Sequence, residues 1–269
     1  MLIKRVLAAL VLAAIGFPAI IVGGVFYFAL ITLLLGIAAW EFGRIFRTAG
    51  YNVSEPLLVG GVVLLVLLRN YFPGEAAVGL TLLTLAAMTW HLLDYENGRD
   101  KAASDFSVTI AGIVYLGWIG AYLIEIRFLH NGLWWLLLVL PAVWFADMAA
   151  YFIGSRFGRH KLSPRLSPKK SWEGYWSGIV LATIGSAGLA VLWHSLGGPA
   201  VPWWKGAALG AAISVLTLFG DLGESMFKRQ AGLKDSSNII PGHGGVLDRI
   251  DSWLWAGALG YFLIIWFLL

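Results

Sequence analysis

Long apolar stretches, interrupted by short polar segments, make up most of this chain. A helix needs about 20 apolar residues to cross a bilayer, and charged or turn residues bound nine stretches that approach this length. The expected spans are Val6–Val22, Gly24–Trp40, Val53–Leu68, Glu75–Leu93, Phe106–Ile124, Leu133–Ile153, Gly174–Leu196, Trp203–Phe219 and Ser252–Leu269. The pattern predicts an all-α integral membrane protein, a polytopic bundle of about nine transmembrane helices. A variant that merges or drops an N-terminal span stays open.

The composition supports a membrane protein. Of the 269 residues, 59% are hydrophobic and only 13% are charged, and the chain has no cysteine. Soluble domains usually carry about 25% charged residues. These values exclude a disulfide scaffold, a disordered chain and an ordinary soluble enzyme.

The distribution of positive charge predicts the orientation, because Lys and Arg concentrate in cytoplasmic loops. With the N-terminus inside and the C-terminus outside, only Arg69, Arg127 and Lys205 of the 19 Lys and Arg residues face outward. The other sixteen are Lys4, Arg5, Arg44, Arg47, Arg99, Lys101, Arg156, Arg159, Lys161, Arg165, Lys169, Lys170, Lys228, Arg229, Lys234 and Arg249. Met1–Pro18 lacks a clear cleavage site and is expected to be the first span rather than a signal peptide.

The segment Gly154–Glu173 is strongly basic and contains two Ser-Pro pairs. Proline fixes φ, and a loop needed only for its charge has no use for such rigidity. Lys169, Lys170 and Ser171 precede the next expected span, where a helix N-terminus favours anions. The residues indicate a polyphosphate site, with a contact to anionic headgroups as the alternative.

The segment Gly220–Asp251 contains two pairs of acids. Asp221 and Glu224 are three residues apart, and Asp248 and Asp251 have the same spacing. This spacing places each pair on one helical face, and ionisable groups at membrane depth are functional candidates. Four carboxylates from two helices suggest a hard-cation site, because Mg²⁺ commonly uses one or two carboxylates plus substrate phosphates.

Other polar residues accompany these acids. The glycine-rich turn Pro241–Gly245 would let backbone amides approach a ligand, although such a turn is often only structural. Asp147, inside the sixth expected span, is either a hydrogen-bonding anchor or part of the same polar cavity. Glu41 and Glu125, at span ends, are interpreted as interfacial. The nearby cations are candidates for ion pairs or phosphate binding: Lys228, Arg229, Lys234 and Arg249.

Three stretches resemble the phosphatidate cytidylyltransferases, the CDP-diacylglycerol synthases. The signature segment Ser225–Asp251 reads SMFKRQAGLKDSSNIIPGHGGVLDRID, Ser167–Gly174 reads SPKKSWEG, and Asp147–Gly158 reads DMAAYFIGSRFG. The N-terminal half resembles the family only in hydropathy. The residues that match the signature are Ser225, Lys228, Arg229, Lys234, Asp235, Pro241, His243, Gly244, Gly245, Asp248, Arg249 and Asp251.

The resemblance implies transfer of CMP from CTP to phosphatidic acid, with Mg²⁺. The sequence leaves open whether a second, monovalent cation assists Mg²⁺. The resemblance also implies a homodimer in a bacterial plasma membrane, with the active site on the cytoplasmic side and no nucleic-acid partner. The expected catalytic residues are Asp221, Asp248, Asp251, Lys228, Arg229 and His243, and the expected metal ligands are Asp221, Asp248, Asp251 and Glu224. The expected substrate-binding residues are Lys169, Lys170, Ser171, Lys234, Asp235, Gly244, Gly245, Arg249 and Asp147.

By these motifs, residues 1–105 form the N-terminal transmembrane helices and residues 106–269 the catalytic region with its loops 154–173 and 220–251. The alternative is an ion-coupled transporter with an intramembrane carboxylate site, which should show two related halves. No such repeat is evident. A CDP-alcohol phosphotransferase is disfavoured because Asp248 and Asp251 are three residues apart and an Asp-Gly start is missing.

Overall fold

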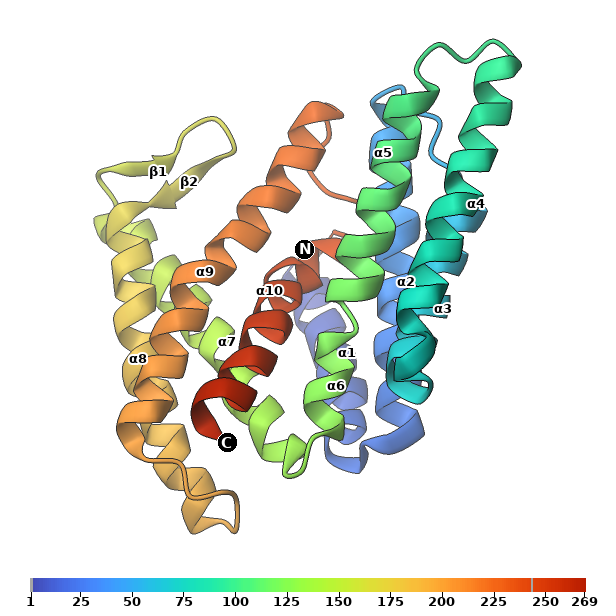
Figure 1. The fold of residues 1–269 in the computed structure, drawn as a ribbon. Helices are drawn as coiled ribbons and strands as arrows, with labels where there is room; N and C mark the ends of the chain where they lie inside the picture. The colour runs from blue at the N-terminus through green and yellow to red at the C-terminus, as the bar shows by residue number, and fades with distance from the viewer. Residues whose placement is uncertain (1, 243) are drawn as a thin grey trace. The chain divides into compact units, whose positions relative to one another are not determined.

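The computed structural model describes residues 2–242 and 244–269, with side chains from residue 10 onward, and it is almost entirely helical (Figure 1). This confirms the expected all-α membrane fold. The helices and strands are α1 (Leu2–Val22), α2 (Gly24–Thr48), α3 (Glu55–Tyr71), η1 (Pro73–Glu75), α4 (Ala76–Glu96), α5 (Ala102–Gly112), η2 (Ile113–Ile119), α6 (Tyr122–Phe128), α7 (Gly132–Phe157), β1 (Lys161–Ser163), β2 (Ser167–Ser171), α8 (Trp172–Ser195), α9 (Trp203–Gln230), α10 (Leu247–Leu263) and η3 (Ile264–Leu268).

Each expected span coincides with a helical segment. Within the described residues, 7 segments are long and apolar enough to cross a membrane. They are Gly24–Thr48, Pro73–Glu96, Ala102–Phe128, Gly132–Phe157, Trp172–Ser195, Trp203–Gln230 and Leu247–Leu268. Helix α3 has 17 residues, and the part of α1 with described side chains, Leu10–Val22, is a shorter apolar helix. The number of crossings and the N-in, C-out orientation stay predictions.

The structure corrects the bounds of the two polar segments. Helix α9 continues to Gln230, beyond the expected end at Phe219, and α10 begins at Leu247, so only residues 231–246 form a loop. Hydropathy locates the apolar part of a helix, whereas the backbone hydrogen bonds continue through polar helix formers such as Glu, Lys, Arg and Gln. In the other segment, Lys161–Ser163 and Ser167–Ser171 form an antiparallel hairpin.

The chain packs as two compact units, of which the first comprises Met1–Ile124 and Phe227–Ile250. Helices α2 and α3 and the π-helical turn η2 form its core, with large apolar side chains that are fully buried. The ring of Phe227, near the end of α9, lies 5.4 Å from the ring of Phe42 and 5.5 Å from that of Phe46. The end of α9 is therefore anchored to α2 in this unit.

The second unit comprises Glu125–Met226 and Asp251–Leu269. Its helices α7 and α8 touch along a row of small residues. A Cβ atom on Gly174 would lie 2.8 Å from the carbonyl oxygen of Ala150, and one on Gly178 would lie 2.8 Å from that of Ala146. Only glycine permits such backbone contact. These two units are defined by how the chain packs. The expected division at residue 105 was based on where the sequence motifs lie, so the two divisions describe different properties.

Candidate functional site

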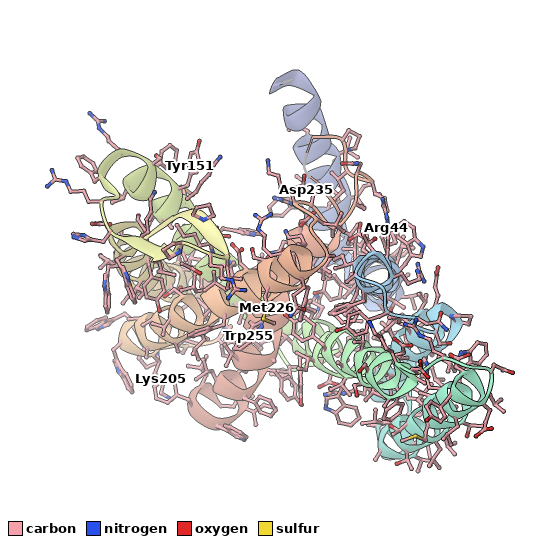
Figure 2. The ribbon with its side chains drawn as sticks, turned by 90° about the horizontal axis from the view of Figure 1, so that it is seen from above. Arg44, Tyr151, Lys205, Met226, Asp235 and Trp255 are labelled. Carbon is pink, nitrogen blue, oxygen red and sulfur yellow. The ribbon has the colours of Figure 1, made fainter. Side chains whose placement is uncertain are left out.

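A cavity of about 450 Å³ lies in the second unit, lined by α7, the β1–β2 hairpin, α8 and α9. Gly154, Gly174 and Gly178 form part of its wall, while Asp147, Lys169, Lys170, Ser171 and Asp221 bring polar groups to it. Tyr151, labelled in Figure 2, belongs to the end of α7 that carries the hairpin. The cavity is therefore lined by residues of two of the family-like stretches, Asp147–Gly158 and Ser167–Gly174.

The closest charged contact at this cavity joins the hairpin to α9. The Lys170 ammonium nitrogen lies 2.6 Å from Asp221 Oδ2, and Ser225 Oγ donates a hydrogen bond of 3.3 Å to Asp221 Oδ1. Asp251 is buried, accepts a hydrogen bond of 2.6 Å from the Ser252 backbone, and interacts electrostatically with Asp221, Lys170 and Asp147. The structure thus brings together four of the predicted site residues: Asp147, Lys170, Asp221 and Asp251.

The hairpin is fixed where it joins α8. Ser171 is the N-cap of α8, and its hydroxyl accepts a hydrogen bond of 3.2 Å from the backbone N–H of Gly174. The Glu173 carboxylate lies 2.7 Å from His160 Nδ1, and the Trp172 N–H donates to the His160 carbonyl at 2.9 Å. These contacts hold the exposed Lys169 at the rim of the cavity.

Asp248 belongs to the first unit and is almost completely engaged by its surroundings. Its Oδ1 lies 2.6 Å from the Lys228 ammonium nitrogen, and the two side chains are only 5% and 11% exposed. Its Oδ2 accepts hydrogen bonds from the Ser236 N–H at 3.0 Å and the Gly245 N–H at 2.7 Å, and it lies 3.0 Å from the Ser236 hydroxyl oxygen, whose single proton it shares with a second carboxylate, that of Glu41. Asp248 therefore ties α9 and loop 231–246 to the start of α10.

Glu41 on α2 is buried and hydrogen-bonded within the protein, a role that its interpretation from sequence as an interfacial acid did not include. Its side chain is 0% exposed and accepts four hydrogen bonds from residues near the C-terminus of the chain. The signal was present, because Glu41 interrupts an apolar run and such acids are functional candidates. Its partners, about 200 residues further along, cannot be read from that run.

The remaining predicted residues surround loop 231–246. Lys234, Asp235 and Arg249 are exposed, and Figure 2 shows Asp235 in the loop after α9. The Arg229 guanidinium donates to the Leu233 carbonyl at 3.1 Å. Gly244 has φ +84° and accepts a hydrogen bond of 2.9 Å from Ile240, closing the glycine-rich turn. The predicted residue His243 lies outside the described residues.

Comparison with known proteins identifies the family. The sequence model of the cytidylyltransferase family matches residues 3–267. The chain belongs to this family. It is 38% identical to the phosphatidate cytidylyltransferase of Pseudomonas aeruginosa, over 94% of this chain and 93% of the relative. The enzymes of the same name from Bacillus subtilis and Synechocystis are 34% and 31% identical, over 94% and 97% of this chain and 94% and 96% of their own lengths. The ion-coupled transporter has no support from these relatives.

The predicted metal ligands of this cytidylyltransferase are distributed over both units. Asp221, Glu224 and Asp251 lie in the second unit and Asp248 in the first. Among the described residues, no group of three His, Asp or Glu side chains is arranged to hold a metal ion. The carboxylate of Asp221 at the cavity still suits Mg²⁺, which often takes one or two carboxylates and completes its shell with water and phosphate oxygens. Mg²⁺ stays a prediction.

Proposed function

We propose that this cytidylyltransferase transfers CMP from CTP to phosphatidic acid, giving CDP-diacylglycerol and pyrophosphate for phospholipid biosynthesis. The observation that carries the proposal is the coverage of the relatives, each named phosphatidate cytidylyltransferase and each matched over 93% or more of its length. The three motifs of the C-terminal half support it as well. A membrane-embedded fold suits a lipid substrate.

The reaction itself asks little of a general base. A phosphate oxygen of phosphatidic acid attacks the α-phosphorus of CTP, and the bond from that phosphorus to the oxygen bridging the β-phosphorus breaks. The electron pair of this bond leaves with pyrophosphate. A phosphate monoester is already anionic at pH 7, so the protein must mainly align two polyanions and neutralise their charge.

The cavity of the second unit offers groups for the triphosphate. Lys169 and Lys170 supply two cations at its rim, and the ion pair with Asp221 fixes the direction of the Lys170 side chain. We assign Asp221 and Asp251 as the first carboxylates for Mg²⁺, with Glu224 beside them on α9. Bound Mg²⁺ would neutralise the triphosphate and the leaving pyrophosphate.

The signature segment offers further groups for phosphate. Arg229, Lys234 and Arg249 are exposed cations, and His243 is a candidate for orienting a phosphate. Lys228 and Asp248 form an ion pair with each other. We therefore assign them two roles, holding the signature segment in its conformation and taking part in the reaction. A cytoplasmic active site, a second monovalent cation and a homodimer are further parts of the proposal.

Two radiolabels test the reaction. Detergent-purified protein is incubated with phosphatidic acid, Mg²⁺ and CTP labelled at either the α- or the γ-phosphorus. We expect α-label in the lipid fraction and γ-label in pyrophosphate, both only when phosphatidic acid is present. Transfer of γ-label to lipid would indicate a kinase, and absence of lipid label from both nucleotides would refute the proposal.

A further inference from the structure

The carboxylate of Glu41 makes an unusual set of contacts for a residue on an N-terminal helix. Its Oε1 accepts hydrogen bonds from the Ser237 hydroxyl at 2.5 Å and the Val246 N–H at 3.0 Å. Its Oε2 accepts from the Ser236 hydroxyl at 3.0 Å and the Leu247 N–H at 2.7 Å. All these residues lie in the first unit. One buried side chain thus binds the middle of loop 231–246, at Ser236 and Ser237, and also its end, at Val246 and Leu247.

The contacts of Glu41 satisfy backbone groups at a helix end, which an ordinary contact between packed helices does not do. Val246 and Leu247 lie at the start of α10, where the first backbone N–H groups have no partner within the helix. A negative charge there is also favourable for the helix dipole. Glu41 therefore acts as an N-terminal cap for α10, but from a different helix and from about 200 residues away in sequence.

Glu41 and Asp248 hold the same part of the loop from two sides. The Ser236 hydroxyl lies 3.0 Å from each carboxylate, and the Gly245 N–H donates to Asp248 at 2.7 Å. A Cβ atom on Gly245 would lie 2.0 Å from Ser236 Oγ and 2.4 Å from Glu41 Oε1. Residue 245 must be glycine for Glu41 to reach its partners.

We propose that Glu41 is a positioning residue for the cytidylyl transfer reaction. It fixes the loop and the start of α10, and through Ser236 and Gly245 it sets the position of the Asp248 carboxylate and its partner Lys228. Glu41 would touch neither substrate. The inference rests on the proposed function for its link to catalysis, while its structural part concerns the conformation of the loop alone.

The test uses an isosteric change and a matched control. E41Q keeps the shape of the side chain but replaces one acceptor oxygen by an amide group, which faces a backbone N–H donor and cannot accept from it. D105N is the control, because Asp105 is an equally buried acid of the first unit. It accepts hydrogen bonds from the Asn52 N–H and from Arg99, and none of these partners belongs to residues 227–250.

Two readouts are compared in each variant. Turnover per folded molecule is measured with saturating CTP, phosphatidic acid and Mg²⁺. The second readout is the rate at which N-ethylmaleimide labels V246C, a reporter at a buried position in a chain that has no other cysteine. We expect E41Q to lower turnover at least tenfold and to raise the labelling rate at least tenfold, while D105N changes neither more than twofold.

The outcomes separate this inference from the proposed function. If the parent protein forms no CDP-diacylglycerol, the proposed function fails, and the labelling rates still decide whether Glu41 holds the loop. Wild-type turnover and labelling in E41Q would overturn the inference, and so would equal losses in D105N. If E41Q does not fold, S237A replaces it, because it keeps the Glu41 carboxylate and removes the donor at 2.5 Å from Oε1, together with the acceptor of the Ile239 N–H at 3.1 Å. Turnover of S237A within twofold of the parent would then overturn the inference.

Discussion

The buried pair of Lys228 and Asp248 allows a quantitative test of the site. The change D248N keeps the shape of the side chain, and its remaining oxygen can still accept from Ser236 and Gly245. Its amide would then face the Lys228 ammonium group, which is 11% exposed. Removing one partner of a buried ion pair costs about 3–5 kcal/mol, because the other charge is left without compensation. For a protein of this size, about 1 kcal/mol lowers the melting temperature by roughly 2–4 °C.

We therefore expect D248N to lower the melting temperature in detergent by roughly 6–20 °C. K228M should have an effect of the same order, and the double variant should be more stable than the sum of both losses implies. E55Q is the control, because Glu55 forms an ion pair with Arg47 in which the side chains are 40% and 33% exposed. Such a pair contributes about 0–1 kcal/mol.

The measurement is thermal unfolding of the parent and the four variants in one detergent, followed by turnover of the folded fraction. An additive double variant, or a D248N protein that melts within about 3 °C of the parent, would refute the assigned role of the pair. A double variant that is stable but inactive would show that these side chains also take part in the reaction.

Three further predictions concern the cavity and the topology. K170A removes one charge-assisted phosphate contact of about 1.5–3 kcal/mol. The value of kcat/KM for CTP should therefore fall roughly 10- to 150-fold, while the KM for lipid stays constant. An unchanged kcat/KM for CTP would indicate that Lys170 contacts the membrane and not CTP. D221N should abolish turnover of folded protein across a Mg²⁺ titration, and normal turnover with normal Mg²⁺ dependence would remove Asp221 from the metal site. An impermeant maleimide should label L269C but not K169C in intact cells, and the reverse pattern would contradict the N-in, C-out orientation.

Hydropathy was sufficient to predict the architecture, because membrane spans are long and their apolar runs are locally readable. It could not predict where helices end, since α9 continues through eleven residues after Phe219, where the chain is polar but the helical backbone hydrogen bonds persist. The β1–β2 hairpin was also missed, because the Ser-Pro pairs indicate a rigid turn without specifying which strands pair.

The residues of the candidate site could be predicted only where they belong to a recognisable sequence motif or charge pattern. Lys170, Asp221 and Asp251 were selected from sequence, and the structure places Lys170 and Asp221 at one cavity, where both interact electrostatically with the buried Asp251. The contacts of Glu41 depend on pairs separated by 195 to 206 positions, and no local pattern encodes such a separation. Asp248 was selected as a metal ligand from its charge and spacing, yet its hydrogen-bond partners also give it a role in holding the loop.

The close contact of α7 and α8 has a consequence for how a ligand would be received. The wall that these helices give to the cavity includes Gly154, Gly174 and Gly178, and at these three positions only backbone can face a ligand. Backbone in a helix has already lost its conformational freedom during folding, and glycine has no rotamers to lose. A ligand that settles against this wall orders little of the protein, so less of its interaction energy is consumed by entropy. The entropic cost of binding would then fall mainly on the side chains at the rim, such as the exposed Lys169.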